Sequence, residues 1–156
     1  MSLGLSRVNE ALKALGRPDR AMDCIHVAGS NGKGSACAQM VAGLVRAGYK
    51  VGLFSSPHLV RIEERVRVDG KSISSDDFDR ALSKVQELSI ELTFFEITYL
   101  VSLLACKEAG VSIMVLETGL GGRLDATRSA DVVGCLVTAI SLEHSDILGD
   151  TIEKVA

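Results

Sequence analysis

Tryptophan is absent from this sequence, proline occurs only twice, and aromatic residues make up 4% of the chain. A core with so few aromatic side chains must be packed from Val, Leu, Ile and Ala, which is typical of a soluble α/β protein. The 156 residues are enough for one domain with a substantial core. We find no internal repeat and no low-complexity linker.

Paired cysteines are also missing from the sequence. Cys24, Cys37, Cys106 and Cys135 never form a C-x-x-C pair, and three of them lie in apolar runs. A zinc site or a disulfide framework is therefore not expected. We predict instead that the thiols are free and buried, in a protein of the reducing cytoplasm.

No basic stripe interleaved with aromatic residues is present, and the formal net charge is −3. Nucleic acid is therefore not an expected partner. The most apolar run, over residues 97–106, is too short to span a membrane. No signal peptide is seen near the first residues, so we expect no membrane partner either.

A glycine-rich turn stands between an apolar run over residues 22–27, predicted to be a buried strand, and an Ala-rich run over residues 36–47, predicted to be a helix. This arrangement forms a phosphate cradle, because glycine lets the backbone approach an anion and the first helical N–H groups point at it. Lys33 adds a mobile positive charge, and Ser35 offers a hydroxyl to a magnesium ion. The turn consists of Gly29, Ser30, Asn31, Gly32, Lys33, Gly34 and Ser35.

The match to the usual P-loop pattern is imperfect. Val27 stands where that pattern has a glycine, and Gly34 stands where it has Ser or Thr. An ordinary glycine-rich turn that contains a lysine is the alternative interpretation. The flanking strand and helix favour phosphate binding.

Strands and helices alternate along the chain, which predicts an α/β fold with a mostly parallel sheet, helices on both faces and the motifs at one edge. Thr93 and Glu96 form a capping box for one of the helices. The cap explains Glu96 without a role in a site. Helices are expected over residues 5–15, 36–47, 75–88, 93–110 and from 150, strands over 22–27, 50–54, 112–116 and 131–140, and a hairpin over 64–73.

Polar residues follow three of the predicted strands. Residues 55–59 come after the second strand, where either a ligand site or a simple polar turn would fit. Glu117 ends an apolar strand, as the second magnesium element of nucleotide-binding proteins does. The glycine-rich loop after it carries Arg123, which could neutralise phosphate charge. His144 lies just past another strand end, so a metal shared with Glu117 is plausible.

The run Arg61, Arg65 and Arg67 lies on the predicted hairpin or beside it. These side chains could touch an anionic substrate. A solvated strand face is the more common explanation of such charges.

Four stretches, in this order, resemble the folylpolyglutamate synthase and dihydrofolate synthase group of the Mur ligase superfamily. They are HVAGSNGKGS over residues 26–35, SPHL over 56–59, ETGLGGRLDAT over 117–127, and SLEH over 141–144 with LGDTI over 148–152. Gly34, which departs from the ordinary P-loop, is typical of this group. The resemblance implies the ATP-binding domain of a Mur ligase, incomplete, and an ATP-dependent ligase that attaches L-glutamate to a folate or to dihydropteroate through an acyl phosphate.

The resemblance also implies roles for single residues. Lys33, Glu117 and His144 would be catalytic, and the turn over residues 29–35 would hold the phosphates of ATP. Two magnesium ions are expected. Ser35 and Glu117 would bind one of them, and Ser56, Glu117 and His144 the other. The substrate-binding residues would be His58, Leu59, Arg123, Asp125 and Ala126.

Three departures from the group's pattern stand out. Glu143 replaces the usual Asp before the histidine, and Arg128 replaces a common Asn. The chain also ends before the group's carboxylated lysine and its C-terminal domain. We therefore interpret residues 1–156 as the N-terminal part of the ATP-binding domain, inactive alone and able to self-associate through an exposed edge, whereas the whole parent protein would be monomeric.

Three other functions remain as alternatives. A Mur-type peptidoglycan ligase would be a close neighbour, but Gly34 and the Ser56-Pro57-His58 loop argue against it. A P-loop module that binds nucleotide without ligase activity and a purely structural domain are more distant alternatives. The motifs are the same for dihydrofolate synthesis and for folate polyglutamylation, so the sequence does not separate these two activities.

Overall fold

A six-stranded sheet in the order β4-β3-β2-β5-β1-β6 forms the middle layer of the computed structural model, which describes residues 5–141 and residue 151. Its strands are β1 (Asp23–Ala28), β2 (Val51–Phe54), β3 (Val66–Val68), β4 (Lys71–Ser72), β5 (Ile113–Glu117) and β6 (Val132–Val137). The α-helices are α1 (Ser6–Ala14), α2 (Lys33–Arg46), α3 (Ser75–Gln86) and α4 (Phe94–Glu108). Three short 3-10 helices are η1 (Pro18–Ala21), η2 (Ile62–Arg65) and η3 (Ala126–Ser129).

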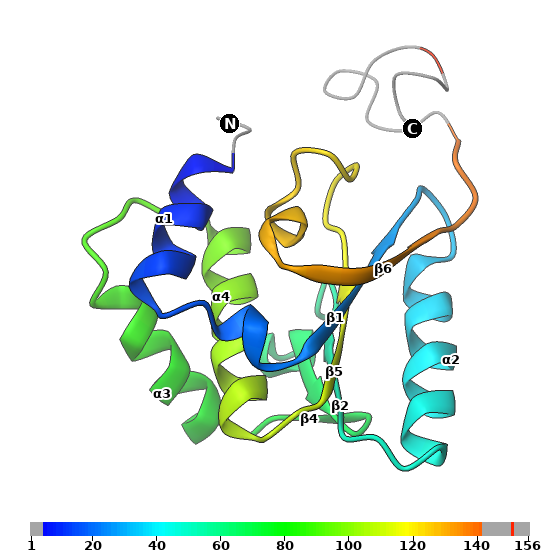
Figure 1. Cartoon of the computed structure of the whole chain (residues 1–156), viewed down its shortest axis with the longest axis horizontal. Coiled ribbons are helices and arrows are strands. Elements are labelled where there is room, and N and C mark those ends of the chain that lie inside the picture. The colour runs from blue at the N-terminus through cyan, green and yellow to red at the C-terminus, as the bar shows by residue number, and fades with distance from the viewer. Residues whose placement is uncertain (1–4, 142–150, 152–156) are drawn as a thin grey trace.

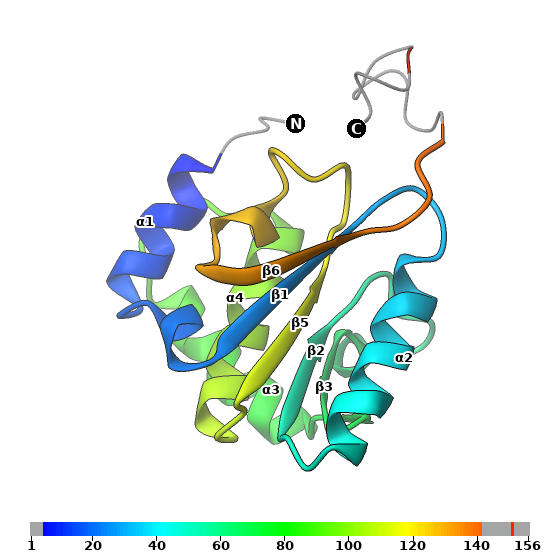
Figure 2. The ribbon, with the colours of Figure 1, turned by 45° about the vertical axis from the view of Figure 1, so that its right-hand side comes forward.

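Strands β2, β5, β1 and β6 run parallel to one another. Strand β3 is antiparallel to β2, and β4 is antiparallel to β3, so only β3 runs against the direction of the other strands. Helix α2 covers one face of the sheet, and α1, α3 and α4 lie on the other (Figures 1 and 2). The predicted α/β class, with a mostly parallel sheet and helices on both faces, is therefore confirmed. The hairpin turn at Asp69 and Gly70 has positive φ at both residues, 51° and 79°, as a two-residue turn of type I′ requires.

The two faces of the sheet bury two separate hydrophobic clusters. Along β5, Met114 and Leu116 point into the larger cluster under α1, α3 and α4, whereas Val115 points into the smaller cluster under α2. A central strand buried on both faces must be apolar at every position, which explains the unbroken hydrophobic run.

Local signals in the sequence set the helix ends. At α4 the Thr93 N–H donates to the Glu96 carboxylate at 2.7 Å, and the Glu96 N–H donates to the Thr93 hydroxyl at 3.3 Å. The predicted capping box is thus confirmed. Ser74 caps α3, and Gly48, at φ 90°, follows α2 as predicted.

Two predictions about the strands were wrong. Glu64 and Arg65 belong to η2 and not to the hairpin, which begins at Val66. Strand β6 was expected to be buried, but Val133 is 67% exposed and Cys135 is also exposed. Strand β6 is exposed because it lies at the edge of the sheet. Of the elements that the structure describes, only β1 packs extensively against it.

The other three cysteines are buried and free, as predicted. No helix among the described residues is long and apolar enough to cross a membrane. The helix expected from residue 150 lies outside the described residues, and self-association through the β6 edge stays a prediction.

Gly52 on β2 gives a test of the packing between the sheet and α4. A Cβ atom added there would lie 2.7 Å from the Cys106 sulfur and 2.8 Å from the Met114 sulfur. We expect Gly52→Ala to lower the free energy of unfolding by about 1–3 kcal/mol, because the core must shift to admit the methyl group. Urea denaturation measures this loss.

Gly43→Ala is the matched control, because a Cβ atom at this position of α2 meets nothing within 4 Å. It should raise the free energy of unfolding by about 0.5–1 kcal/mol, through helix propensity alone. Equal unfolding midpoints for the two variants would contradict the packing described here.

Candidate functional site

The glycine-rich turn joins β1 to α2 at the carboxyl edge of the sheet. Gly29 has φ 134°, and a Cβ atom there would lie 2.1 Å from the Thr138 hydroxyl oxygen, so only glycine fits. The N–H groups of Ser30 and Asn31 donate to the Ala139 carbonyl at 2.9 and 3.2 Å. These bonds tie the turn to the segment that follows β6.

The N–H groups of residues 33–35 belong to the first turn of α2 and have no partner inside that helix. They are left to bind an anion at the positive end of the helix dipole. The Lys33 ammonium group lies beside them and donates to the Gly29 carbonyl at 2.6 Å. The turn therefore presents one mobile cation and a set of amide donors at the same place.

Glu117, the last residue of β5, faces this turn. Its side chain is buried, and one carboxylate oxygen lies 3.6 Å from where a Cβ atom on Gly34 would be. The other oxygen accepts a long hydrogen bond, 3.4 Å, from the Ser56 N–H. Burial raises the pKa of Glu117, while the Ser56 N–H and the Lys33 charge act in the opposite direction. The predicted metal residue thus lies between the glycine-rich turn and the loop after β2.

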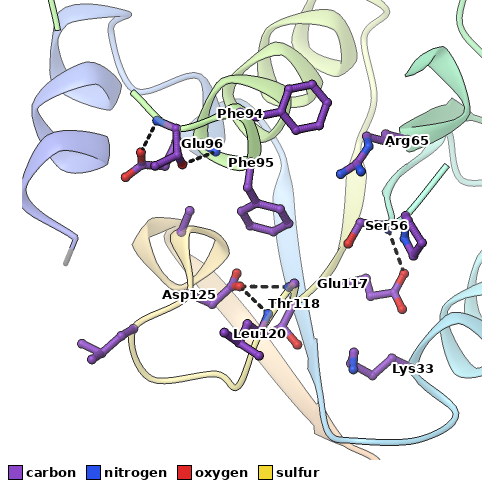
Figure 3. Close-up of a pocket in the computed structure, with 15 residues that line it drawn as sticks. Lys33, Ser56, Arg65, Phe94, Phe95, Glu96, Glu117, Thr118, Leu120 and Asp125 are labelled. Atoms are coloured by element: carbon purple, nitrogen blue, oxygen red, sulfur yellow. Dashed lines mark hydrogen bonds between the residues drawn. The ribbon is translucent and has the colours of Figure 1, made fainter. Parts of the chain in front are cut away.

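A cavity of about 560 Å³ opens beside Glu117. Figure 3 shows Lys33, Ser56 and Glu117 along one side of it. The wall is mostly apolar with a few charged groups, as in sites for small organic ligands. Its remaining lining residues are Pro57, Arg65, Thr93, Phe94, Phe95, Glu96, Thr118, Gly119, Leu120, Leu124, Asp125 and Ala126.

Asp125 holds the glycine-rich loop that forms the opposite wall. One carboxylate oxygen accepts from the Gly119 and Leu120 N–H groups at 2.9 and 3.0 Å (Figure 3). The other accepts from the N–H and the hydroxyl of Thr127 at 3.0 and 2.6 Å. Asp125 therefore fixes the shape of the wall, because its oxygens are used within the protein.

His26 on β1 completes this network, and sequence reasoning missed it. Its Nε2 atom lies 2.8 Å from the Thr127 hydroxyl oxygen. Because that hydroxyl donates its proton to Asp125, the imidazole must donate from Nε2. Burial lowers the pKa of His26, the nearby Asp125 charge opposes this shift, and the neutral ring fits the donor role.

Arg65 is the second residue whose role was misjudged from the sequence. It is only 8% exposed, so a solvated strand face is the wrong description of this arginine. Its Nε donates to His58 Nδ1 at 2.8 Å, and its guanidinium lies 5.1 Å from the centre of the Phe94 ring. Burial lowers the pKa of Arg65. Among the described residues it has no carboxylate partner, although it lines the cavity.

The other predicted site residues are spread more widely. Ala126 lines the cavity. His58 does not line it but accepts a hydrogen bond from Arg65, which does. Leu59 is 90% exposed and does not line the cavity. Arg123 lines a different cavity. The roles assigned to these residues, and to Ser35 in the first turn of α2, stay predictions.

His144 and its neighbour Glu143 lie outside the described residues. Within the part of the chain that is described, no three His, Cys, Asp or Glu side chains gather closely enough to hold a metal ion by themselves. A metal site formed by the described residues alone would therefore have to combine Glu117 with hydroxyl oxygens or with oxygens from a ligand.

Strand, glycine-rich turn and helix, with a buried acid on the neighbouring parallel strand, define a nucleotide-binding α/β domain. Solved structures agree with this class. Escherichia coli FolC in complex with DHPP and ADP superimposes with a TM-score of 0.95 at 41% identity, over 99% of this chain and 38% of that one. A bifunctional folylpolyglutamate synthase/dihydrofolate synthase with Mn, AMPPNP and L-glutamate bound gives 0.92 at 39% identity, over 99% and 39%.

Among curated proteins, the dihydrofolate synthase/folylpolyglutamate synthase of Escherichia coli is 42% identical over 157 aligned residues, which are 99% of this chain and 37% of that protein. No family model matches the chain. These comparisons support the chain as a fragment of the folylpolyglutamate synthase/dihydrofolate synthase family, matching an N-terminal part of these relatives. It spans less than two fifths of the length of these relatives.

Thr127→Val tests the network around Asp125. The change keeps the shape of the side chain but leaves His26 Nε2 and one Asp125 oxygen without their hydroxyl partner. We expect the free energy of unfolding to fall by about 1–3 kcal/mol, because buried polar groups lose a hydrogen bond.

Thr118→Val is the control for this change. Thr118 is equally buried, yet its hydroxyl has no hydrogen-bond partner in the part of the chain that the structure describes, so the same substitution should leave stability unchanged or slightly raised. Chemical denaturation of both variants measures the difference. A loss at Thr118 as large as that at Thr127 would show that the network contributes nothing specific.

Glu117→Gln tests the cost of the buried carboxylate. The folded protein holds a proton on Glu117 more tightly than the unfolded chain does, so stability falls as the pH rises through the interval between the two pKa values. The amide variant avoids this loss. It should be more stable than the parent chain at about pH 7, and the difference should shrink toward about pH 4.

Urea unfolding at the two pH values is the measurement, and Glu10→Gln on the exposed side of α1 is the control. A Glu117→Gln variant that is less stable than its parent at neutral pH would mean that the carboxylate stabilises the fold.

Proposed function

We propose that the protein containing this chain ligates L-glutamate to a folate, to dihydropteroate, or to both, with ATP as the energy source. The observation that carries the proposal is that Lys33 and the first amides of α2 meet Glu117 at the side of a mostly apolar cavity. The ADP, DHPP, AMPPNP and L-glutamate bound to the solved relatives support the same ligands here.

The chemistry explains why these groups are needed. A carboxylate is a poor electrophile for an amine. Transfer of the γ-phosphoryl group from ATP to a carboxylate oxygen forms an acyl phosphate and releases ADP. The glutamate amine then attacks the carbonyl carbon, the C–O bond to phosphate breaks, and the amine loses a proton as the amide forms. Two anions must approach each other in the first step, so catalysis depends on positive charge and positioning.

The site has two parts, a phosphate-binding turn and an apolar cavity for the carboxylate substrate. Lys33 and the amides of residues 33–35 would bind the phosphates, with Lys33 moving from the Gly29 carbonyl to a phosphate oxygen. Phe95 and Leu120 would hold the flat pteridine and keep water from the acyl phosphate. Arg65, buried and without a carboxylate partner among the described residues, would orient the anionic end of the substrate.

A divalent cation fits the site. The Glu117 carboxylate is buried and accepts a single long hydrogen bond from the described residues, so it retains capacity for a metal. Mg²⁺ is typically held by one or two carboxylates together with phosphate oxygens and water. Glu117 would hold one ion together with Ser35, and a second ion together with Ser56 and His144. When bound, these ions would neutralise phosphate charge. Both ions are part of the proposal, and Mn in solved relatives supports a metal of this kind.

The remaining expectations belong to the same proposal. Residues 1–156 would be the N-terminal part of the ATP-binding domain, and a C-terminal domain would complete the ligase. We infer that the 156-residue chain alone is inactive and that the whole protein is monomeric and cytoplasmic. A Mur-type peptidoglycan ligase remains the close alternative, and the substrate test below separates the two.

The first experiment is a calorimetric titration of this chain with Mg-ATP. Lys33→Ala should weaken binding by about 10- to 100-fold, because charge-assisted hydrogen bonds to phosphate are lost. Lys13→Ala, an exposed lysine of α1, is the control and should bind as the parent chain does. Equal affinity for all three chains would contradict a phosphate site at this turn.

The second experiment uses the full-length protein. ATP consumption should require glutamate together with dihydropteroate or a reduced folate, and a UDP-linked muramyl substrate should not replace them. If the protein binds nucleotide but none of these acceptors stimulates ATP consumption, the proposed ligase activity is contradicted. The protein would then be a nucleotide-binding module without ligase activity.

A further inference from the structure

A second cavity, of about 470 Å³, lies between α1, the segment around η1 and the segment around η3. Four arginines line it: Arg17, Arg20, Arg123 and Arg128. We propose that this cavity is a binding site for a small polyanion, one that carries two or more adjacent phosphate or carboxylate groups. It shares no lining residue with the cavity beside Glu117, so the inference stands independently of the proposed function.

The charge balance of the cavity leaves guanidinium groups available. Arg17 is paired with Asp19 at 2.5 Å, and Asp19 is fully buried. Arg20 lies 3.5 Å from Asp131, and both of these side chains are about two thirds exposed, so their attraction is weak in water.

The two remaining arginines carry the excess charge. Among the described residues neither Arg123 nor Arg128 has a carboxylate partner within ion-pair distance. The cavity is therefore positive on a chain whose formal net charge is −3. Positive groups collected in a concave surface raise the local concentration of anions more than scattered ones do.

The two walls of the cavity are fastened to each other inside the protein. The Asp19 carboxylate that pairs with Arg17 also accepts a hydrogen bond from the Asp131 N–H at 3.0 Å. This bridge fixes the segment after α1 against the segment after η3. On the second wall, the Asp125 carboxylate holds the start of η3 through the Thr127 N–H. The arginines therefore project from a preformed frame, which reduces the entropy lost on binding.

The chemistry of guanidinium groups defines the ligand class. Each one offers a planar fork of N–H donors that matches phosphate and carboxylate oxygens in pairs. The volume of the cavity is in the range that holds a small organic molecule, so a ligand with several anionic groups can meet arginines on both walls at once. The Asn9 amide at the edge adds a neutral donor.

The test uses inorganic triphosphate and citrate as probes, in separate calorimetric titrations without metal. The 156-residue chain carries Lys33→Ala in every sample, so that the glycine-rich turn does not compete for triphosphate. We expect one of the probes to bind, and the pair of probes shows whether phosphate or carboxylate is preferred. Affinity should fall steeply with added salt, because the contacts are ionic.

The double variant Arg123→Gln/Arg128→Gln should bind at least ~10-fold more weakly. Both arginines are exposed, so folding should be retained, which a thermal unfolding curve checks. Arg46→Gln on the exposed side of α2 removes the same charge outside the cavity and should bind as its parent does. Failure of both probes to bind, or equal affinity for the double variant and the Arg46→Gln control, would overturn the proposal.

Discussion

The parallel pairing of β1, β5 and β2 is the constraint on which the site depends. Val27 on β1 lies beside Glu117 on β5, and Phe54 on β2 lies beside Leu116. Because parallel strands end at the same edge, the turn after β1, the Ser56 loop after β2 and the last residue of β5 meet there. The two hydrophobic clusters stabilise this pairing from both faces. The geometry of the site therefore depends on strand pairing and core packing that extend well beyond its own residues.

Two charged side chains in the cavity are buried beyond what their partners compensate. Burial raises the pKa of Glu117 and lowers that of Arg65, and in each case the shift opposes the charged form. Ionised groups without full partners destabilise a folded protein. A cation beside Glu117 or an anion beside Arg65 would remove that penalty, so part of the binding free energy of a charged ligand comes from the folded state itself. The same incompletely compensated burial of charge thus lowers the stability of the folded protein and raises its affinity for charged ligands.

The sequence was sufficient for most of the fold, because periodicity, caps and turns are local signals. The box at Thr93 and Glu96, the αL glycine after α2 and the apolar run of β5 each predict an element that the structure contains. Exposure of β6 was not predictable, because it depends on strand order in the sheet. The burial of Arg65 was not predictable either, because it depends on tertiary packing. The hydrogen bond between His26 and Thr127 joins segments that are far apart in the chain. The glycine-rich turn and Glu117 were predictable from the sequence, because each lies at the end of an apolar run that marks a strand.

The Asp125 carboxylate fixes the backbone next to both cavities through hydrogen bonds within the protein. Its two oxygens accept hydrogen bonds from the loop before it and from Thr127 after it, so both segments keep their shape by internal contacts. Within this short stretch Leu124 and Ala126 line the first cavity, whereas Arg123 lines the second. Adjacent residues on a fixed backbone cannot move independently. The position of the apolar wall and the position of the arginine wall are therefore set together, by hydrogen bonds that exist before any ligand arrives.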